Sequence, residues 1–72
     1  MLVIAIGKQR IVVDNLIHWQ VTDNVLSFYY TNGHHTDVKA ITHTDALGML
    51  DTLDQAVRDL ERGLSTRWIR LA

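Results

Sequence analysis

Apolar residues follow two different periods along the chain. Over the first two thirds they alternate with polar residues, as in half-buried strands, and over the last third they recur at the 3.6-residue spacing of an amphipathic helix. No linker or low-complexity tract separates the two parts, so we expect one domain over residues 1–72. The alternating part predicts strands at about residues 2–6, 9–13, 17–22, 25–30 and 34–40. The remainder predicts a helix at about residues 43–62 and a C-terminal segment at 64–72.

Two-residue turns connect the first two pairs of strands. Gly7-Lys8 suits a type II′ turn because Gly comes first, and Asp23-Asn24 suits a type I′ turn because both residues tolerate positive φ. The second turn places Thr22 opposite Val25, and the register follows by counting back. One face of this hairpin is then wholly apolar, with Ile17, Trp19 and Val21 lying across from Tyr30, Phe28 and Leu26.

The next turn, Thr31-Asn32-Gly33, is compatible with two loop lengths. A two-residue Asn-Gly loop places charged Asp37 and Lys39 on the apolar face of the sheet. A three-residue loop with a left-handed Gly33 turns Thr36 and Val38 to that face instead. We favour the three-residue loop because it keeps the charges in solvent.

Capping signals mark both ends of the helix. Thr42 followed by Asp45 approximates a capping box, and Gly63 is placed to act as a left-handed C-cap, with Leu64 folding back on Leu60. The apolar stripe between these ends faces the sheet, and charged residues occupy the other side.

Gly48 lies inside this helix, where Gly costs about 1 kcal/mol relative to Ala. We expect it to mark a close approach of the helix to the sheet or to a partner helix.

These elements predict an α+β fold. The expected architecture is a small antiparallel β-meander of about four strands, either as one sheet or as two separate hairpins, packed by one amphipathic α-helix. A short C-terminal strand or docked tail completes it.

One helix shields only part of such a sheet, and contiguous exposed apolar area usually indicates a partner. The unpaired edges of a small open sheet favour association as well. We therefore expect a homodimer, with the C-terminal segment exchanged or added to a partner's edge; in the alternative, this segment closes the core of its own chain. The expected interface residues are Trp68, Ile69, Leu71, Val3 and Val12.

Composition narrows the ways in which so small a domain can be reinforced. With 72 residues, a core rarely supplies more than about 3 to 5 kcal/mol, and disulfides, a metal or self-association usually add to it. The absence of cysteine excludes disulfides, thiolate metal sites and thiol catalysis, and favours a cytoplasmic protein. No apolar run approaches the roughly 20 residues of a membrane span, so we expect no membrane partner.

The net charge of the chain helps to decide whether nucleic acid is a partner. The net charge is −1, far from the basic balance of a general nucleic-acid binder. From residue 58 onward, however, four arginines outnumber two acidic residues. A nucleic-acid-binding regulator is therefore the alternative function, with arginines on phosphates and an indole stacked on a base. Its residues are Arg58, Arg62, Arg67, Trp68 and Arg70.

The histidines raise a second alternative, a metal-binding protein. The hairpin registers place His18 and His35 on either side of Tyr29, with Asp37 in the neighbouring row. Imidazole and carboxylate are metal ligands, so His18, His35 and Asp37 are the candidates. A solvated polar sheet face explains the same residues without a metal, and we expect no cofactor.

No catalytic constellation is evident. Ser27, His18 and Asp37 have the composition of a Ser-His-Asp set, but a flat sheet face offers neither a desolvated cleft nor an oxyanion hole. We therefore expect a protein that is not an enzyme, and the leading function is a small homo-oligomeric interaction or regulatory module.

The stretch Val13-Asp14-Asn15-Leu16-Ile17, followed by a hairpin and the Thr31-Asn32-Gly33 turn, resembles the short flagellar regulators of the FlbD type. It is also similar to the DNA-binding LytTR domain. The resemblance covers less than half of the chain and consists of a strand, a turn and a strand. Because any β-meander produces that pattern, it implies no function.

Overall fold

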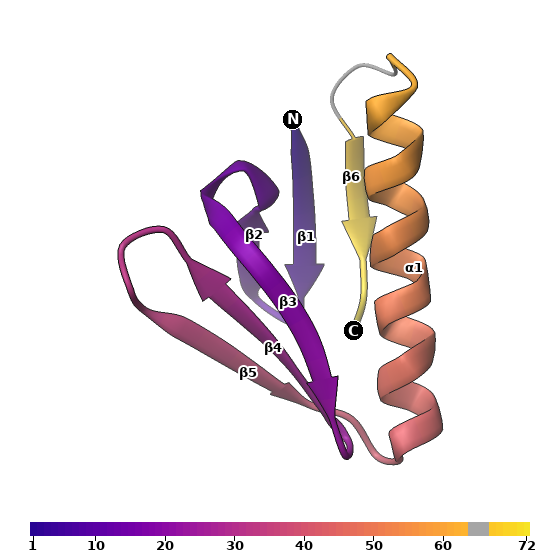
Figure 1. The fold of residues 1–72 in the computed structure, drawn as a ribbon. Helices are drawn as coiled ribbons and strands as arrows, with labels where there is room; N and C mark the ends of the chain where they lie inside the picture. Colours follow the sequence, from indigo (N-terminus) through magenta and orange to yellow (C-terminus); the bar gives the residue numbers. More distant parts are fainter. Residues whose placement is uncertain (64–66) are drawn as a thin grey trace.

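A computed structural model describes residues 1–63 and 67–72 (Figure 1). Over these residues the chain forms six strands, one 3-10 turn and one α-helix. The order is β1 (Leu2–Ile6), β2 (Gln9–Val12), η1 (Val13–Asn15), β3 (Leu16–Thr22), β4 (Val25–Tyr30), β5 (His35–Lys39), α1 (His43–Glu61) and β6 (Arg67–Arg70). The α+β class is confirmed, and each predicted strand and the helix lies within one residue of its expected bounds.

The strands form two three-stranded sheets, β2-β1-β6 and β3-β4-β5. β1 and β2 are antiparallel, and Gly7 between them has a φ of +58°, as a type II′ turn requires. β6 lies beside β1 in the same direction, with Leu2 opposite Arg67 and Ala5 opposite Arg70. In Figure 1 this strand runs between β1 and α1. The C-terminal segment therefore pairs with its own chain, which is the alternative to an exchanged strand.

The second sheet is the predicted antiparallel meander, with two corrections. Trp19 lies opposite Phe28 and Thr22 opposite Val25, as expected. The prediction that Ile17 lies on the apolar face is wrong: the register shifts between Leu16 and His18, and Ile17 is 64% exposed. Leu16 takes the place opposite Tyr30 because the backbone N–H of Thr31 is bonded to the carbonyl of Asn15, which fixes where β3 begins.

The Asp23-Asn24 turn is not the predicted type I′. Asp23 has a φ of +54° and is the only non-glycine with positive φ among the described residues, whereas type I′ needs two. Asn24 is held by Ala40: its side-chain amide donates to the Ala40 carbonyl at 2.7 Å, and its own carbonyl accepts from the Ala40 N–H at 2.8 Å. The side chain of His43 also donates to the Asp23 carbonyl. The turn is thereby tied to the segment that leads into α1.

The three-residue loop at Thr31-Asn32-Gly33 is confirmed. Gly33 has a φ of +90°, and the Tyr30 N–H donates to the His34 carbonyl across the loop. Thr36 lies opposite Phe28 and Val38 opposite Leu26, so the charged residues of β5 face away from the core.

Both sheets and the helix contribute to one core. The buried cluster takes residues from β1 and β2, from β4, and from α1: Leu2, Ile4, Ile11, Leu26, Phe28, Leu53 and Ala56. Each fully buried large apolar side chain contributes on the order of 1.5 to 3 kcal/mol, which the conformational entropy lost on folding then opposes.

The helix ends are largely as predicted. The Thr42 hydroxyl accepts from the Asp45 N–H at 3.1 Å, and Gly63 after the last turn has a φ of +90°. The expected contact of Leu64 with Leu60 lies outside the described residues. A close approach of the helix to the sheet at Gly48 is wrong, because a Cβ built there meets no atom within 4 Å.

Candidate interaction surface

The outer face of the β2-β1-β6 sheet brings an exposed indole into one row with two half-buried apolar residues. Because Leu2, Ile4 and Ile11 point into the core, the alternate residues of these strands point outward. Val12, Val3 and Trp68 form one cross-strand row, and Arg10, Ala5 and Arg70 form the next. We call these six residues the Trp68 face.

Among the apolar and aromatic residues of this face, exposure is concentrated on Trp68. The Trp68 side chain is 54% exposed, whereas Val3 and Val12 are half-buried and Ala5 is fully buried. An indole half open on a sheet face, next to two β-branched apolar residues, is an apolar surface that the described residues leave partly uncovered.

Two guanidinium groups lie against the indole. The Arg10 and Arg70 guanidinium carbons are 5.4 and 5.6 Å from the Trp68 ring centroid, within cation–π range. Arg10 also donates to the carbonyls of Gly7 and Gln9, and Arg70 donates to the carbonyl of Ala72. Neither arginine forms an ion pair with an aspartate or glutamate side chain in the described part of the chain. The face therefore carries its indole on the edge strand β6 and its two cations in the row next to the indole.

The structure places the predicted interface residues in two different environments. Val3, Val12 and Trp68 share one row, but Ile69 and Leu71 lie half-buried against the core. Sequence reasoning missed Arg10. Its place opposite Ala5 follows from the first hairpin, but its approach to Trp68 depends on the parallel β1–β6 pairing, which no local signal reports.

The predicted nucleic-acid set is also divided. Trp68 and Arg70 lie on the Trp68 face, whereas Arg58 belongs to α1 and Arg62 caps its end. The side chain of Arg67 lies outside what the structure describes. The two guanidinium groups already lie against the indole, so a base stacking there has to displace them.

The outer face of β3-β4-β5 carries the predicted aromatic column. The His18 and Tyr29 ring centroids are 4.3 Å apart, and those of Tyr29 and His35 are 5.6 Å apart. Both pairs are stacked, so the phenol separates the two imidazoles. Among residues 1–63 and 67–72, no three metal-ligating side chains converge, and His18, His35 and Asp37 do not surround a common point.

Ser27 and His35 share the carboxylate of Asp37. The Ser27 hydroxyl donates to Asp37 Oδ1 at 2.7 Å, and His35 Nε2 lies 3.7 Å from Asp37 Oδ2. In a nucleophilic triad the histidine stands between the hydroxyl and the carboxylate, and here the carboxylate takes that place. The arrangement therefore orders a polar surface and does not activate Ser27.

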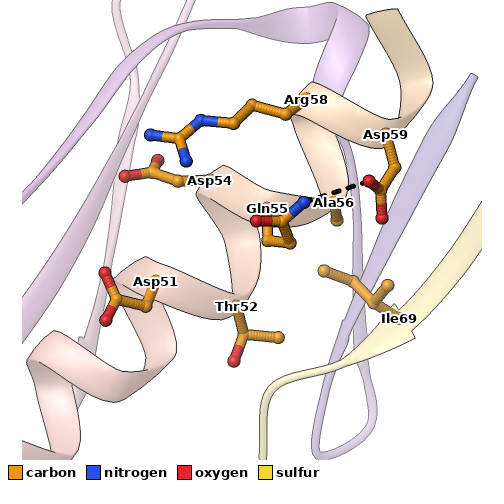
Figure 2. A pocket seen from close by; sticks show the side chains of 8 residues that line it. All are labelled: Asp51, Thr52, Asp54, Gln55, Ala56, Arg58, Asp59 and Ile69. Atoms are coloured by element: carbon orange, nitrogen blue, oxygen red, sulfur yellow. Dashed lines mark hydrogen bonds between the residues drawn. The ribbon is translucent and has the colours of Figure 1, made fainter. Parts of the chain in front are cut away.

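A polar groove runs along α1 (Figure 2). Gln55 donates to Asp59 at 3.0 Å, and the Arg58 side chain extends toward Asp54. Asp54 also accepts from the indole N–H of Trp19, at 3.0 Å. Ile69 of β6 is the large apolar residue in the groove lining, and most of the other lining residues are charged or amide side chains of one exposed helix face. The groove offers solvated charges and no desolvated pair for chemistry.

A second groove lies between the end of β5, the first half of α1 and the end of β6. Its lining includes Ile41, which is 91% exposed, together with Gly48 and Met49. Its lining mixes apolar residues with charged ones, which are Lys39, Asp45 and Arg70. It is therefore less uniformly apolar than the row through Trp68.

No protein-family model, curated protein or solved structure matches this chain. The described residues contain no helix that is both long and apolar enough to cross a membrane.

Proposed function

We propose that this chain is a non-enzymatic interaction module that functions as a homodimer and uses the Trp68 face as its dimer interface. The observation that carries the proposal is the continuous row of Val12, Val3 and Trp68, whose indole is 54% exposed on a face that no other described element covers. We also propose the cytoplasm as its location, on the basis of its cysteine-free composition.

The composition of the face supports this choice over the other surfaces. Trp and Arg are the residues most enriched among those that dominate interface energetics, and the Trp68 face holds one Trp and two Arg around an apolar row. Covering the exposed half of an indole contributes on the order of 2 to 3 kcal/mol per chain, at about 25 cal/mol for each Å² of apolar surface. A two-fold dimer gains this twice.

Association also adds stability to a chain whose own core is small. Among the described residues the buried cluster holds seven, and neither a disulfide nor a thiolate metal site is available to a chain without cysteine. A second copy packed on the Trp68 face extends the core from one chain into the next, because β1 contributes Leu2 and Ile4 to one side and Val3 to the other.

Trp68→Ala tests the proposal, with Ile41→Ala as the matched control. Ile41 is more exposed than Trp68 but lies at the second groove, so its truncation removes apolar surface without touching the Trp68 face. In sedimentation equilibrium at micromolar concentration we expect a dimer for the wild type and for Ile41→Ala. For Trp68→Ala we expect a folded monomer, or a dissociation constant raised by about a hundredfold or more.

Circular dichroism identifies any variant that loses its fold. A Trp68→Ala protein that dimerises as tightly as the wild type contradicts the proposal. Binding of a labelled oligonucleotide at low salt, lost in Trp68→Ala while the protein stays monomeric throughout, favours the nucleic-acid alternative instead.

A further inference from the structure

We propose that the second groove binds an extended segment of a partner protein, which adds as a strand to the free edge of β5 and places an acidic residue beside Lys39. The inference goes beyond the dimer proposed above, because it assigns a second surface and a different kind of partner. Three features of the described residues carry it: the unpaired backbone edge of β5, the groove at the end of that edge, and a cation without an acidic partner.

The backbone of β5 is open along one side. Among the described residues this strand pairs only with β4. The backbone N–H of Ala40 donates to the carbonyl of Asn24, on the β4 side. Because backbone groups along a strand point alternately to its two edges, His35, Asp37 and Lys39 direct theirs away from β4. Figure 1 shows no described helix or strand beyond this edge, so its N–H and C=O groups are available to an added strand.

The second groove receives the side chains of such a strand. It lies at the end of β5, has a volume of about 560 Å³, and includes Val38, Ile41 and Met49 in its lining. Val38 packs against the core, and an added strand turns every second side chain to that same side. Ile41 is 91% exposed, so apolar side chains in the groove cover surface that the described residues leave in solvent. Backbone pairing then supplies affinity, and the groove selects the side chains.

The charges at the groove indicate an acidic segment. On the outer side of β5, Asp37 already accepts a hydrogen bond from Ser27. Lys39 is exposed and forms no ion pair with an acidic side chain among the described residues. The groove lining holds two cations, Lys39 and Arg70, and one acidic residue, Asp45. The groove is therefore locally positive in a chain whose net charge is −1, and it complements a carboxylate of the partner.

A second copy of this chain is the alternative occupant of the edge. Charged side chains on edge strands act against pairing between copies, and the outer side of β5 carries Asp37 and Lys39. If the proposed dimer forms through the Trp68 face, a further two-fold contact through β5 links the dimers into an open polymer. A segment of another protein occupies the edge without extending the assembly, and we therefore choose it as the partner.

Two peptides with opposite charge test the recognition. The probe is a fluorescently labelled peptide of alternating valine and glutamate with blocked termini, and its counterpart has lysine in place of glutamate. By fluorescence anisotropy we expect the wild type to bind the glutamate peptide with a dissociation constant in the micromolar range, and the lysine peptide at least about tenfold more weakly. We expect Lys39→Glu to reverse this preference. The matched control is Lys8→Glu, which makes the same charge change in the exposed turn between β1 and β2, and we expect it to keep the wild-type preference.

Backbone N-methylation separates strand addition from attraction between charges. One glutamate peptide is methylated at the valine nitrogens and another at the glutamate nitrogens. Because alternate residues of an added strand face opposite edges, only one of the two loses its bonds to β5. We expect one peptide to bind like the parent and the other at least about tenfold more weakly. Lys39→Pro removes an N–H from the free edge, where proline is tolerated, and we expect it to keep the wild-type circular dichroism spectrum and to bind neither peptide.

The proposal is wrong if the wild type does not bind the glutamate peptide, if Lys39→Glu still prefers it, or if both methylated peptides bind equally well. Self-association of the wild type that Lys39→Pro abolishes would assign the edge to a second copy and also contradict it. The dimer is tested separately by the variants already described. We expect Trp68→Ala to bind the glutamate peptide as a monomer, and Ile41→Ala to remain a dimer that binds the peptide more weakly.

Discussion

The two tryptophans of this chain lie in opposite environments. Trp19 is half-buried opposite Phe28, and its indole N–H donates to Asp54 on α1, which joins the second sheet to the helix. Trp68 faces outward, and its described contacts are with the guanidinium groups of Arg10 and Arg70. Residue type alone does not separate a core tryptophan from one that faces outward. The strand register does, because it fixes the face on which each indole lies.

Gly48 gives a prediction at this scale. The helix interior disfavours Gly, and the position of its Cβ is open space, so we expect Gly48→Ala to stabilise the protein by about 0.5 to 1 kcal/mol. Urea unfolding at a fixed protein concentration measures the change, with exposed Asp51→Ala as a control expected to stay within about 0.5 kcal/mol of the wild type. A destabilised Gly48→Ala protein, or one with a weakened dimer, would show that another helix packs against Gly48.

At the scale of elements, the sequence predicts what local chemistry determines. Turn lengths determine the hairpin registers, so the pairs Thr22–Val25 and Phe28–Thr36 could be counted from the turns. The helix ends follow from Thr42 and Gly63, whose capping chemistry is local.

The predictions that were wrong depend on contacts between residues far apart in the sequence. Asn24 is kept out of the left-handed region by Ala40, 16 residues away, and Ile17 is displaced by the turn that precedes β3. The division into two sheets depends on the pairing of β1 with β6, whose residues lie at opposite ends of the chain. For that reason the sequence predicted Val3, Val12 and Trp68 as separate interface residues. It did not predict that they share one surface.

Removal of β6 tests the role of this element. A chain ended after Gly63 loses the parallel partner of β1 and the core contacts of Ile69 and Leu71. Full burial of such a side chain contributes on the order of 1.5 to 3 kcal/mol and half-burial about half of that, so the two together supply a large part of the stability of a domain this small. We expect the truncated chain to be unfolded by circular dichroism. A truncated chain with the wild-type spectrum and a cooperative unfolding transition would show that β6 is not required for the fold.

At the scale of the whole molecule, the first sheet has two apolar sides. Its inner side supplies Leu2, Ile4 and Ile11 to the core, and its outer side presents Val3, Val12 and Trp68. A sheet that is apolar on both sides is normally covered by a layer on each side, and the described part of this chain covers only the inner side. The second copy is proposed to cover the outer side, which gives a sandwich of two β2-β1-β6 sheets at the centre of the dimer.

The molar mass in solution tests this account most directly. Light scattering coupled to size-exclusion chromatography of the wild-type chain, over a concentration series in the micromolar range, measures it without any variant. The account predicts a species with twice the 8.2 kDa of one chain, which dissociates toward that mass on dilution. A mass of one chain at every concentration would contradict it.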